Sequence, residues 1–241
     1  MKSILITAML MLAPLTAHAE PPYRGTIWAG FDIIRTDDTS AFDTLMSAGT
    51  GSREMFDRRS NSLVTRTAYL FIATFTDGLE IKIQVNPEFG SVEEAEKQAL
   101  RHLPAVGQLP TLLRSDVETM TIHAGDNDYG GGNNDLLIHT GRTAQYIRAK
   151  NLEETLFHEA VHISIDGRYA DSPEWKAAQA ADSDFISSYA RDNPDREDMA
   201  ESMLPAYGVL IHPNRISAMQ RDTIRETMPN RLAFFEALLA E

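Results

Sequence analysis

Apolar and polar positions in the first half of the chain follow the short, two-residue period of β-strands. Runs rich in β-branched and aromatic residues cover 67–76 and 79–85, and Asp77-Gly78 separates them. A two-residue connection that contains glycine predicts a β-hairpin, because glycine adopts the positive φ of a tight turn without steric cost. Residues 117–123 and 136–140 have the same character and predict two further strands.

Two other segments of this half break the strand pattern. Residues 91–103 begin with Ser91 and Glu94 at capping-box spacing and continue with apolar residues three or four apart, which predicts an amphipathic helix. Residues 125–134 lie between the two later strands and are rich in Gly, Asn and Asp, which predicts a loop. The first half is therefore expected to be mainly sheet.

The period becomes helical from Asn151 onward. Asn151 is a typical N-cap, Glu153 and Glu154 are favourable in a first helical turn, and Asp166-Gly167 predicts the end of that helix. Four more helices are predicted, at residues 172–190, 195–204, 214–227 and 230–240. Because strands come first and helices second, the pattern predicts an α+β fold rather than alternating βαβ units.

The first 19 residues have the pattern of a secretory signal peptide. Lys2 precedes a short apolar stretch at residues 4–15, and Ala17-His18-Ala19 has the small residues of a cleavage site. A membrane anchor is the alternative, but the apolar stretch falls short of the roughly 20 residues that span a bilayer. We therefore expect cleavage after Ala19, a periplasmic or secreted protein without a membrane span, and one domain over residues 20–241.

The amino-acid composition limits which partners the protein can bind and which residues can hold a metal. The sequence has 22 Lys and Arg against 35 Asp and Glu, a net charge of −13, which repels phosphate backbones and anionic membranes. Nucleic acid is therefore not expected as a partner. The chain has no cysteine and seven histidines, so any metal has to be held by His, Asp or Glu.

The strongest chemical signal is His158-Glu159-Ala160-Val161-His162, on the first predicted helix of the second half. Residues four apart share a helix face, so both imidazoles can reach one zinc ion, while Glu159 lies about 100° round the helix and can reach a water on that ion. The alternative is a solvated surface helix, but its other positions are mostly apolar, which indicates burial. The pattern predicts Zn²⁺ bound by His158 and His162, with Glu159 as the general base. Three other histidines are expected to be structural or exposed: His123, His139 and His212.

A third ligand is expected from Glu197 or Glu201, which are four apart on a later predicted helix. One of them could bind the metal while the other accepts a hydrogen bond from a ligating imidazole and fixes its tautomer. Paired acids on a helix are also common on solvated surfaces. The His-Glu-x-x-His helix needs another protein ligand for zinc, and this favours the metal-site interpretation.

These motifs and their spacing resemble the gluzincin branch of the zincin metallopeptidases. Glu197-Asp198-Met199-Ala200-Glu201 is similar to the Glu-Phe-Phe-Ala-Glu helix of lethal-factor-like and Pro-Pro endopeptidases, and the resemblance covers about residues 135–207. It implies that Glu197 is the zinc ligand, that Glu201 supports a ligating histidine, and that Tyr189 polarises the scissile carbonyl. It also implies a zincin-like fold, with an N-terminal mixed sheet packed on the His158 helix and a helical C-terminal subdomain.

The chain also departs from related groups. Ile165 stands where metzincins have a glycine, and the Asn-Glu-x-x-Ser-Asp pattern of thermolysin is absent, so neither group indicates the substrate. Zincins carry an edge strand that pairs with extended substrate. Residues 136–140 are placed to form that strand, or else to form an ordinary core strand.

Together these features predict a zinc metallopeptidase that cleaves peptide bonds by metal-activated water, with a protein, a short peptide or a cell-wall peptide as substrate. A non-catalytic periplasmic binding protein with a structural zinc site is one alternative. Glu159 weighs against it, because a purely structural site has no use for a base beside an open coordination position. Hydrolysis of a non-peptide amide is another alternative.

Overall fold

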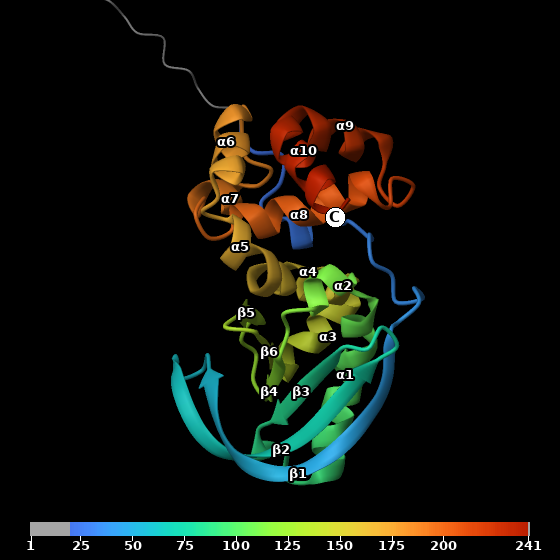
Figure 1. Cartoon of the computed structure of the whole chain (residues 1–241), viewed down its shortest axis with the longest axis vertical. Coiled ribbons are helices and arrows are strands. Elements are labelled where there is room, and N and C mark those ends of the chain that lie inside the picture. The colour runs from blue at the N-terminus through green and yellow to red at the C-terminus, as the bar shows by residue number, and fades with distance from the viewer. Residues whose placement is uncertain (1–19, 241) are drawn as a thin grey trace, which may run out of the picture.

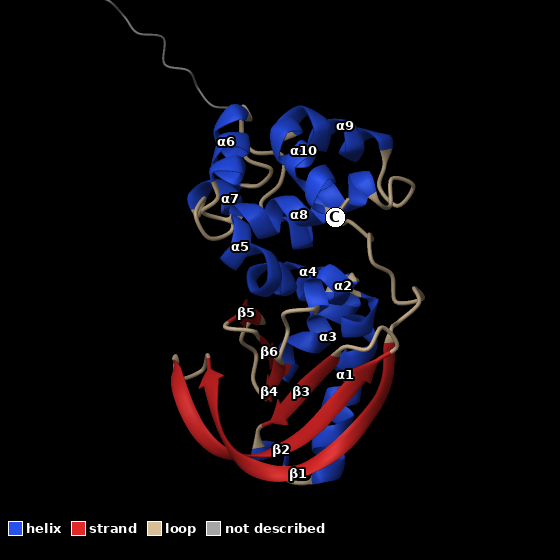
Figure 2. Cartoon of the chain, viewed as in Figure 1, coloured by secondary structure: helices blue, strands red, loops and turns tan. Residues whose placement is uncertain are grey.

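The computed structural model describes residues 20–240, and the predicted signal peptide, residues 1–19, lies outside that range. The N-terminal part of the described chain contains a mixed six-stranded sheet with helices against it. The C-terminal part is helical, and Figure 1 and Figure 2 show the two parts meeting at a central layer of helix. The predicted α+β class is confirmed.

The strands of the sheet are β1 (Phe42–Asp57), β2 (Ser62–Phe75), β3 (Glu80–Val85), β4 (Thr119–His123), β5 (Gly130–Gly132) and β6 (Asp135–His139). Their order across the sheet is β1-β2-β3-β4-β6-β5. The first three strands are antiparallel to one another, β3, β4 and β6 run parallel, and β5 returns antiparallel to β6. β5 is therefore an edge strand, and β6 lies inside the sheet.

The β1–β2 hairpin is long and strongly curved (Figure 1). The sequence pattern does not predict β1, because most of its side chains are exposed on both faces and apolar residues do not alternate with polar ones. The predicted hairpin of β2 and β3 is confirmed, but the two-residue turn is wrong, because residues 76–79 connect the strands and the Phe75 N–H bonds to the Leu79 carbonyl oxygen. Gly78 has a φ of 86° in this turn. Predicted strands β4 and β6 are also present, with ends that shift by one or two residues.

Three helices accompany the sheet: α1 (Val92–Gln108), α2 (Thr111–Arg114) and α3 (Thr140–Ala149). The Ser91 hydroxyl accepts a hydrogen bond from the Glu94 N–H, which confirms the predicted start of α1. The helix continues past its predicted end and through Pro104. Residues beyond it, including Val106, are buried, and this burial offsets the hydrogen bond that proline cannot donate.

The central helix, α4 (Leu152–Val161), lies between the sheet and the C-terminal helices (Figure 1). Glu159 is its one residue that is not buried, so the predicted burial is confirmed. The predicted helix end at Asp166-Gly167 is wrong. The helix continues through a π-helical segment, His162–Asp166, into α5 (Gly167–Tyr169), because Gly167 has helical angles (φ −59°, ψ −22°) rather than the positive φ of a terminating glycine.

The other helices are α6 (Pro173–Ala181), α7 (Ser188–Asp192), α8 (Asp198–Leu210), α9 (Ala218–Thr227) and α10 (Pro229–Leu238). The prediction of one helix over 172–190 is wrong, because the Asp182 carboxylate accepts backbone hydrogen bonds from Asn230 and Arg231 and the chain leaves the helix there. The predicted helix at 195–204 begins later and runs through Pro205. Among the described helices, none combines the length and apolar character that crossing a bilayer requires.

Two local predictions near the central helix also need correction. The predicted loop at 125–134 contains the strand β5. Its three glycines pair with β6 through the backbone and have no side chains whose pattern could predict a strand. Asn151 stands at the N-cap of α4, but its amide donates to the Ile27 carbonyl oxygen (3.0 Å) instead of capping the helix. That bond ties α4 to the segment at the N-terminal end of the described chain.

Candidate metal centre

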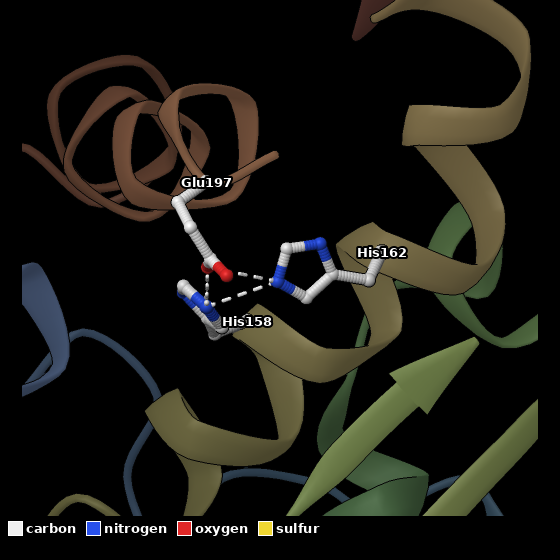
Figure 3. Close-up of side chains that lie close together, drawn as sticks. All are labelled: His158, His162 and Glu197. Carbon is white, nitrogen blue, oxygen red and sulfur yellow. Dashed lines mark hydrogen bonds and ion pairs between the residues drawn. The ribbon is translucent and has the colours of Figure 1, made fainter. Parts of the chain in front are cut away.

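Two histidines and a glutamate from separate elements meet beside α4 (Figure 3). His158 projects from α4, His162 begins the π-helical segment, and Glu197 is the residue just before α8. The two imidazole Nε2 atoms are 3.2 Å apart. Glu197 Oε2 lies 3.4 Å from His158 Nε2 and 3.3 Å from His162 Nε2.

These separations suit a tetrahedral metal ion. Zinc binds imidazole nitrogen and carboxylate oxygen at about 2.0–2.2 Å, which places two ligands of a tetrahedral site about 3.3 Å apart. All three measured separations are close to that value. The group of His158, His162 and Glu197 could therefore hold a metal ion, and its donor set is one that zinc accepts.

The ionised carboxylate of Glu197 favours binding of a cation between the three side chains. Burial opposes ionisation of Glu197, but hydrogen bonds and charge from both histidines outweigh it and hold the pKa of that carboxyl well below its usual range. Burial likewise opposes the charged form of His162, yet the carboxylates of Asp166 and Glu197 raise the pKa of His162 to about 10. A metal has to displace that proton, so metal binding is linked to pH.

Each histidine has a carboxylate behind it. The Nδ1 atom of His162 is 2.6 Å from Asp166 Oδ2, which fixes the ring with Nε2 toward the metal position. The Nδ1 atom of His158 is 3.8 Å from Glu201 Oε1. These two atoms are not hydrogen-bonded, and His158 Nδ1 is buried without a hydrogen-bond partner in the described structure. Glu201 lies near His158 and is not one of the three converging residues.

Buried partners fix the position of Glu201 and of α8. The second oxygen of Glu201, Oε2, accepts hydrogen bonds from the Thr26 N–H (2.7 Å) and the Ser187 hydroxyl (2.6 Å). At the start of α8, the fully buried Asp198 accepts a hydrogen bond from Arg231 of α10 at 2.8 Å. Because Asp198 follows Glu197 directly, the C-terminal helices hold the third metal-site residue in place.

Glu159 and Tyr189 line the same cleft as the metal group, a space of about 950 Å³. The Glu159 carboxylate has no hydrogen-bond or ion-pair partner within the described range, which leaves it free to face a bound water. Tyr189 lies on α7 and is 44% exposed. Burial of its hydroxyl and the charge of Glu197 raise the pKa of Tyr189 to about 12, so the phenol stays a hydrogen-bond donor at neutral pH.

Of the two alternatives for residues 136–140, the structure shows the core strand, because this segment forms the internal strand β6 and the edge strand beside the cleft is β5. β5 passes directly over the central helix. A Cβ atom on Gly131 would lie 1.9 Å from the Glu159 carbonyl oxygen, so only glycine allows this approach. The same lack of side chains hides the strand from sequence patterns.

Sequence reasoning missed the segment that precedes β1. Its Tyr23 and Arg24 form backbone hydrogen bonds with residues 186–189, including the Tyr189 N–H to the Arg24 carbonyl oxygen (3.0 Å). The segment then reaches Glu201 through Thr26. No spacing in the sequence could reveal that contact, whereas Asp166 stands four residues after His162 and could have been found as its partner.

The remaining predicted histidines lie outside the metal group. His123 and His139 are fully buried at the ends of β4 and β6, where their rings stack with centroids 5.5 Å apart. His212 packs against Tyr207. All three therefore have the structural surroundings that were expected of them.

Comparisons of the chain with family models, curated proteins and solved structures found no match. The function has to be inferred from the geometry of the site and from the motifs that form it.

Proposed function

We propose that the protein is a zinc-dependent peptidase of zincin-like architecture that works in the periplasm or outside the cell after its signal peptide is removed. One observation carries the proposal. His158, His162 and Glu197 have the spacing of a tetrahedral zinc site, and the unpartnered carboxylate of Glu159 lines the same cleft. A purely structural site needs no base beside an open position, so this arrangement favours catalysis.

The side chains take separate roles in this proposal. When bound, zinc supplies Lewis acidity that lowers the pKa of a water and polarises the substrate carbonyl. Glu159 accepts the proton of the attacking water and passes it to the leaving amine. Tyr189 donates a hydrogen bond to the carbonyl oxygen as negative charge develops there.

The edge strand β5 supports a peptide as the substrate. It pairs with β6 on one side only, so its other side offers backbone N–H and C=O groups to an extended chain. Gly130–Gly132 carries no side chains that would hold a substrate backbone away. A peptide paired there would lie beside the helix that carries Glu159.

The deciding experiment compares wild type with Glu159→Gln, both loaded with zinc, in a cleavage screen over a broad peptide library. The amide keeps the shape of the side chain and removes the base, so the variant should hold one zinc per chain and lose hydrolysis by at least about 100-fold. Mass spectrometry of the products and elemental analysis of the protein measure the two outcomes. Zinc-loaded wild type that cleaves no peptide would favour a non-catalytic zinc protein.

A further inference from the structure

Two arginines line the cleft without an ionic partner. Arg24 and Arg58 both form part of its wall, and neither guanidinium is within ion-pair or hydrogen-bond distance of another described residue. The third arginine of the wall, Arg196, is bound to Glu197 Oε1 at 3.0 Å.

The acids of the cleft are, by contrast, already engaged. Three of them form ion pairs: Asp128 with Arg142, Asp166 with His162, and Asp195 with Lys176. Glu197 and Glu201 belong to the metal centre, and Glu159 is the proposed base. The charges of the wall that are left for a ligand side chain are therefore the two guanidinium groups.

Arg58 is held at its place by its neighbours in the β1–β2 hairpin. The next residue, Arg59, binds the buried carboxylate of Asp57 and reaches Glu88 at 2.7 Å. The Phe56 carbonyl oxygen accepts a hydrogen bond from His123 Nε2 at 3.1 Å. These bonds fasten the hairpin tip to the sheet, while the side chain of Arg58 lies against the backbone of β5, where a Cβ on Gly130 would be 2.5 Å from its Nη2 atom.

Arg24 lines the cleft from the segment that pairs with α7. Its carbonyl oxygen accepts the Tyr189 N–H at 3.0 Å and the Ser188 hydroxyl at 3.3 Å, so its backbone is fixed next to the proposed carbonyl-polarising tyrosine. Arg58 thus belongs to the β1–β2 hairpin, and Arg24 to the N-terminal segment that pairs with residues 186–189. Guanidinium groups bind carboxylates with two parallel hydrogen bonds, which gives orientation as well as charge attraction.

We propose that the cleft selects anionic peptides, whose acidic side chains or terminal carboxylate pair with Arg58 and Arg24 in the wall of the cleft that holds the candidate metal centre. The inference rests on the proposed peptidase function and names its substrate class. Acidic residues outnumber basic ones in the protein as a whole, and this net negative charge repels anionic peptides. Attraction of such peptides is therefore expected only at the arginines of the cleft.

Binding of matched peptides tests the proposal without relying on turnover. Zinc-loaded Glu159→Gln protein is titrated into fluorescein-labelled peptides that differ only in carrying Glu, Gln or Lys at one position, scanned along the peptide, and anisotropy gives the affinities. Glu peptides should bind about three- to tenfold more tightly than their Gln counterparts, and salt should reduce the difference. Arg58→Gln and Arg24→Gln, made in the same background, should bring that ratio toward one.

Arg66→Gln is the matched control, because Arg66 lies on the same hairpin, outside the cleft, and its guanidinium bonds only to the neighbouring Thr65 carbonyl oxygen. This variant should keep the wild-type ratio. Equal binding of Glu and Gln peptides, no binding of any peptide, or a ratio that survives the Arg24/Arg58 double variant would overturn the proposal. Selective binding of acidic peptides that wild type does not cleave would refute peptidase function and leave anionic recognition standing. Cleavage of peptides without a preference for acidic residues would support peptidase function and refute anionic recognition.

Discussion

His158 and His162 are each backed by a carboxylate, but only one of the two supports is local in sequence. Asp166 is hydrogen-bonded to His162 across one helical turn, whereas Glu201, on a different helix, lies 3.8 Å from His158 Nδ1 without a hydrogen bond. Glu201 in turn depends on donors from two further segments, Thr26 and Ser187. The two histidines therefore differ in how far their orientation depends on the rest of the fold.

Removing the two glutamates of the metal centre should have unequal effects. Glu197→Ala deletes one of the three converging atoms, so zinc affinity and activity should both collapse. Glu201→Ala should release only the orientation of His158, with a loss of about 10- to 100-fold in affinity. Glu201→Gln keeps an acceptor for Thr26 and should fall between wild type and the alanine variant. Titration against a zinc chelator gives the order, and the reverse order would make Glu201 the ligand.

Glu154 should make stability depend on pH. It is almost fully buried, and burial raises its pKa to about 7, against hydrogen bonds that its Oε1 accepts from the Ile33 and Ile34 N–H groups. The native state therefore binds more protons than the unfolded state between about pH 4.5 and pH 7, so this residue lowers stability as pH rises through that range.

Glu154→Gln keeps the accepting oxygen and removes the charge. The variant should be more stable than wild type at pH 8 by roughly 1–3 kcal/mol, and the difference should disappear near pH 4.5. Urea unfolding across this pH range measures it. Glu96→Gln, at an exposed position of α1, is the control and should show no such trend. A difference between Glu154→Gln and wild type that does not change with pH would contradict the assignment.

At the scale of elements, sequence patterns identify those segments whose own side chains carry the signal. The β2–β3 hairpin, α1 and the burial of α4 follow from turn residues, caps and apolar spacing. β1 and β5 do not, because one is exposed on both faces and the other is made of glycine. For the site, the pattern found His158, Glu159 and His162 and left two glutamates open. The other element boundaries depend on tertiary contacts. At Asp182, for example, hydrogen bonds from Asn230 and Arg231 end the helix that the sequence predicts to continue to residue 190.

Two glycines on either side of the metal centre should respond oppositely to alanine. Gly131→Ala places a Cβ against the α4 backbone, so β5 has to move away and stability should fall by about 1–3 kcal/mol. Gly167→Ala meets no atom within 4 Å and lies at helical angles, so stability should rise by up to about 1 kcal/mol. Thermal unfolding of both variants checks the pair. A destabilised Gly167→Ala would mean that the continuous helix from α4 to α5 is wrong.

At the scale of the whole molecule, the candidate metal centre joins three distant parts of the chain: the segment around Thr26, the central helix α4 and the start of α8. A single cluster of buried apolar side chains runs through the sheet, α4 and the C-terminal helices and keeps these parts in register. The coarse α+β class follows from the order of strands and helices. The assembly of the three parts does not, because it depends on contacts between residues far apart in sequence.

Thr26→Pro should isolate the longest of these contacts. Thr26 is the first residue of a 3₁₀ turn and follows Gly25 in an extended conformation, so proline is compatible with the backbone there. It replaces the N–H that donates to Glu201 by a ring carbon, and it also removes the threonine hydroxyl. Zinc affinity should fall by about tenfold. Thr26→Ala, which removes a buried hydroxyl without a partner in the described structure, should leave it unchanged. Equal affinity in the two variants, measured by chelator competition, would contradict a role for this segment.

The bond between Thr26 and Glu201 spans 175 residues, and this separation has a consequence for how the protein comes into being. A ribosome releases residues 23–26 long before it has made their partners at 186–189 and 201, so the leading segment stays unpaired through most of synthesis. Loop closure over such a distance is slow compared with the formation of local hairpins and helices. A chain interrupted before Glu197 has the two histidines of the candidate metal site but lacks its glutamate. The site can therefore form only after the chain has been made as far as Glu201.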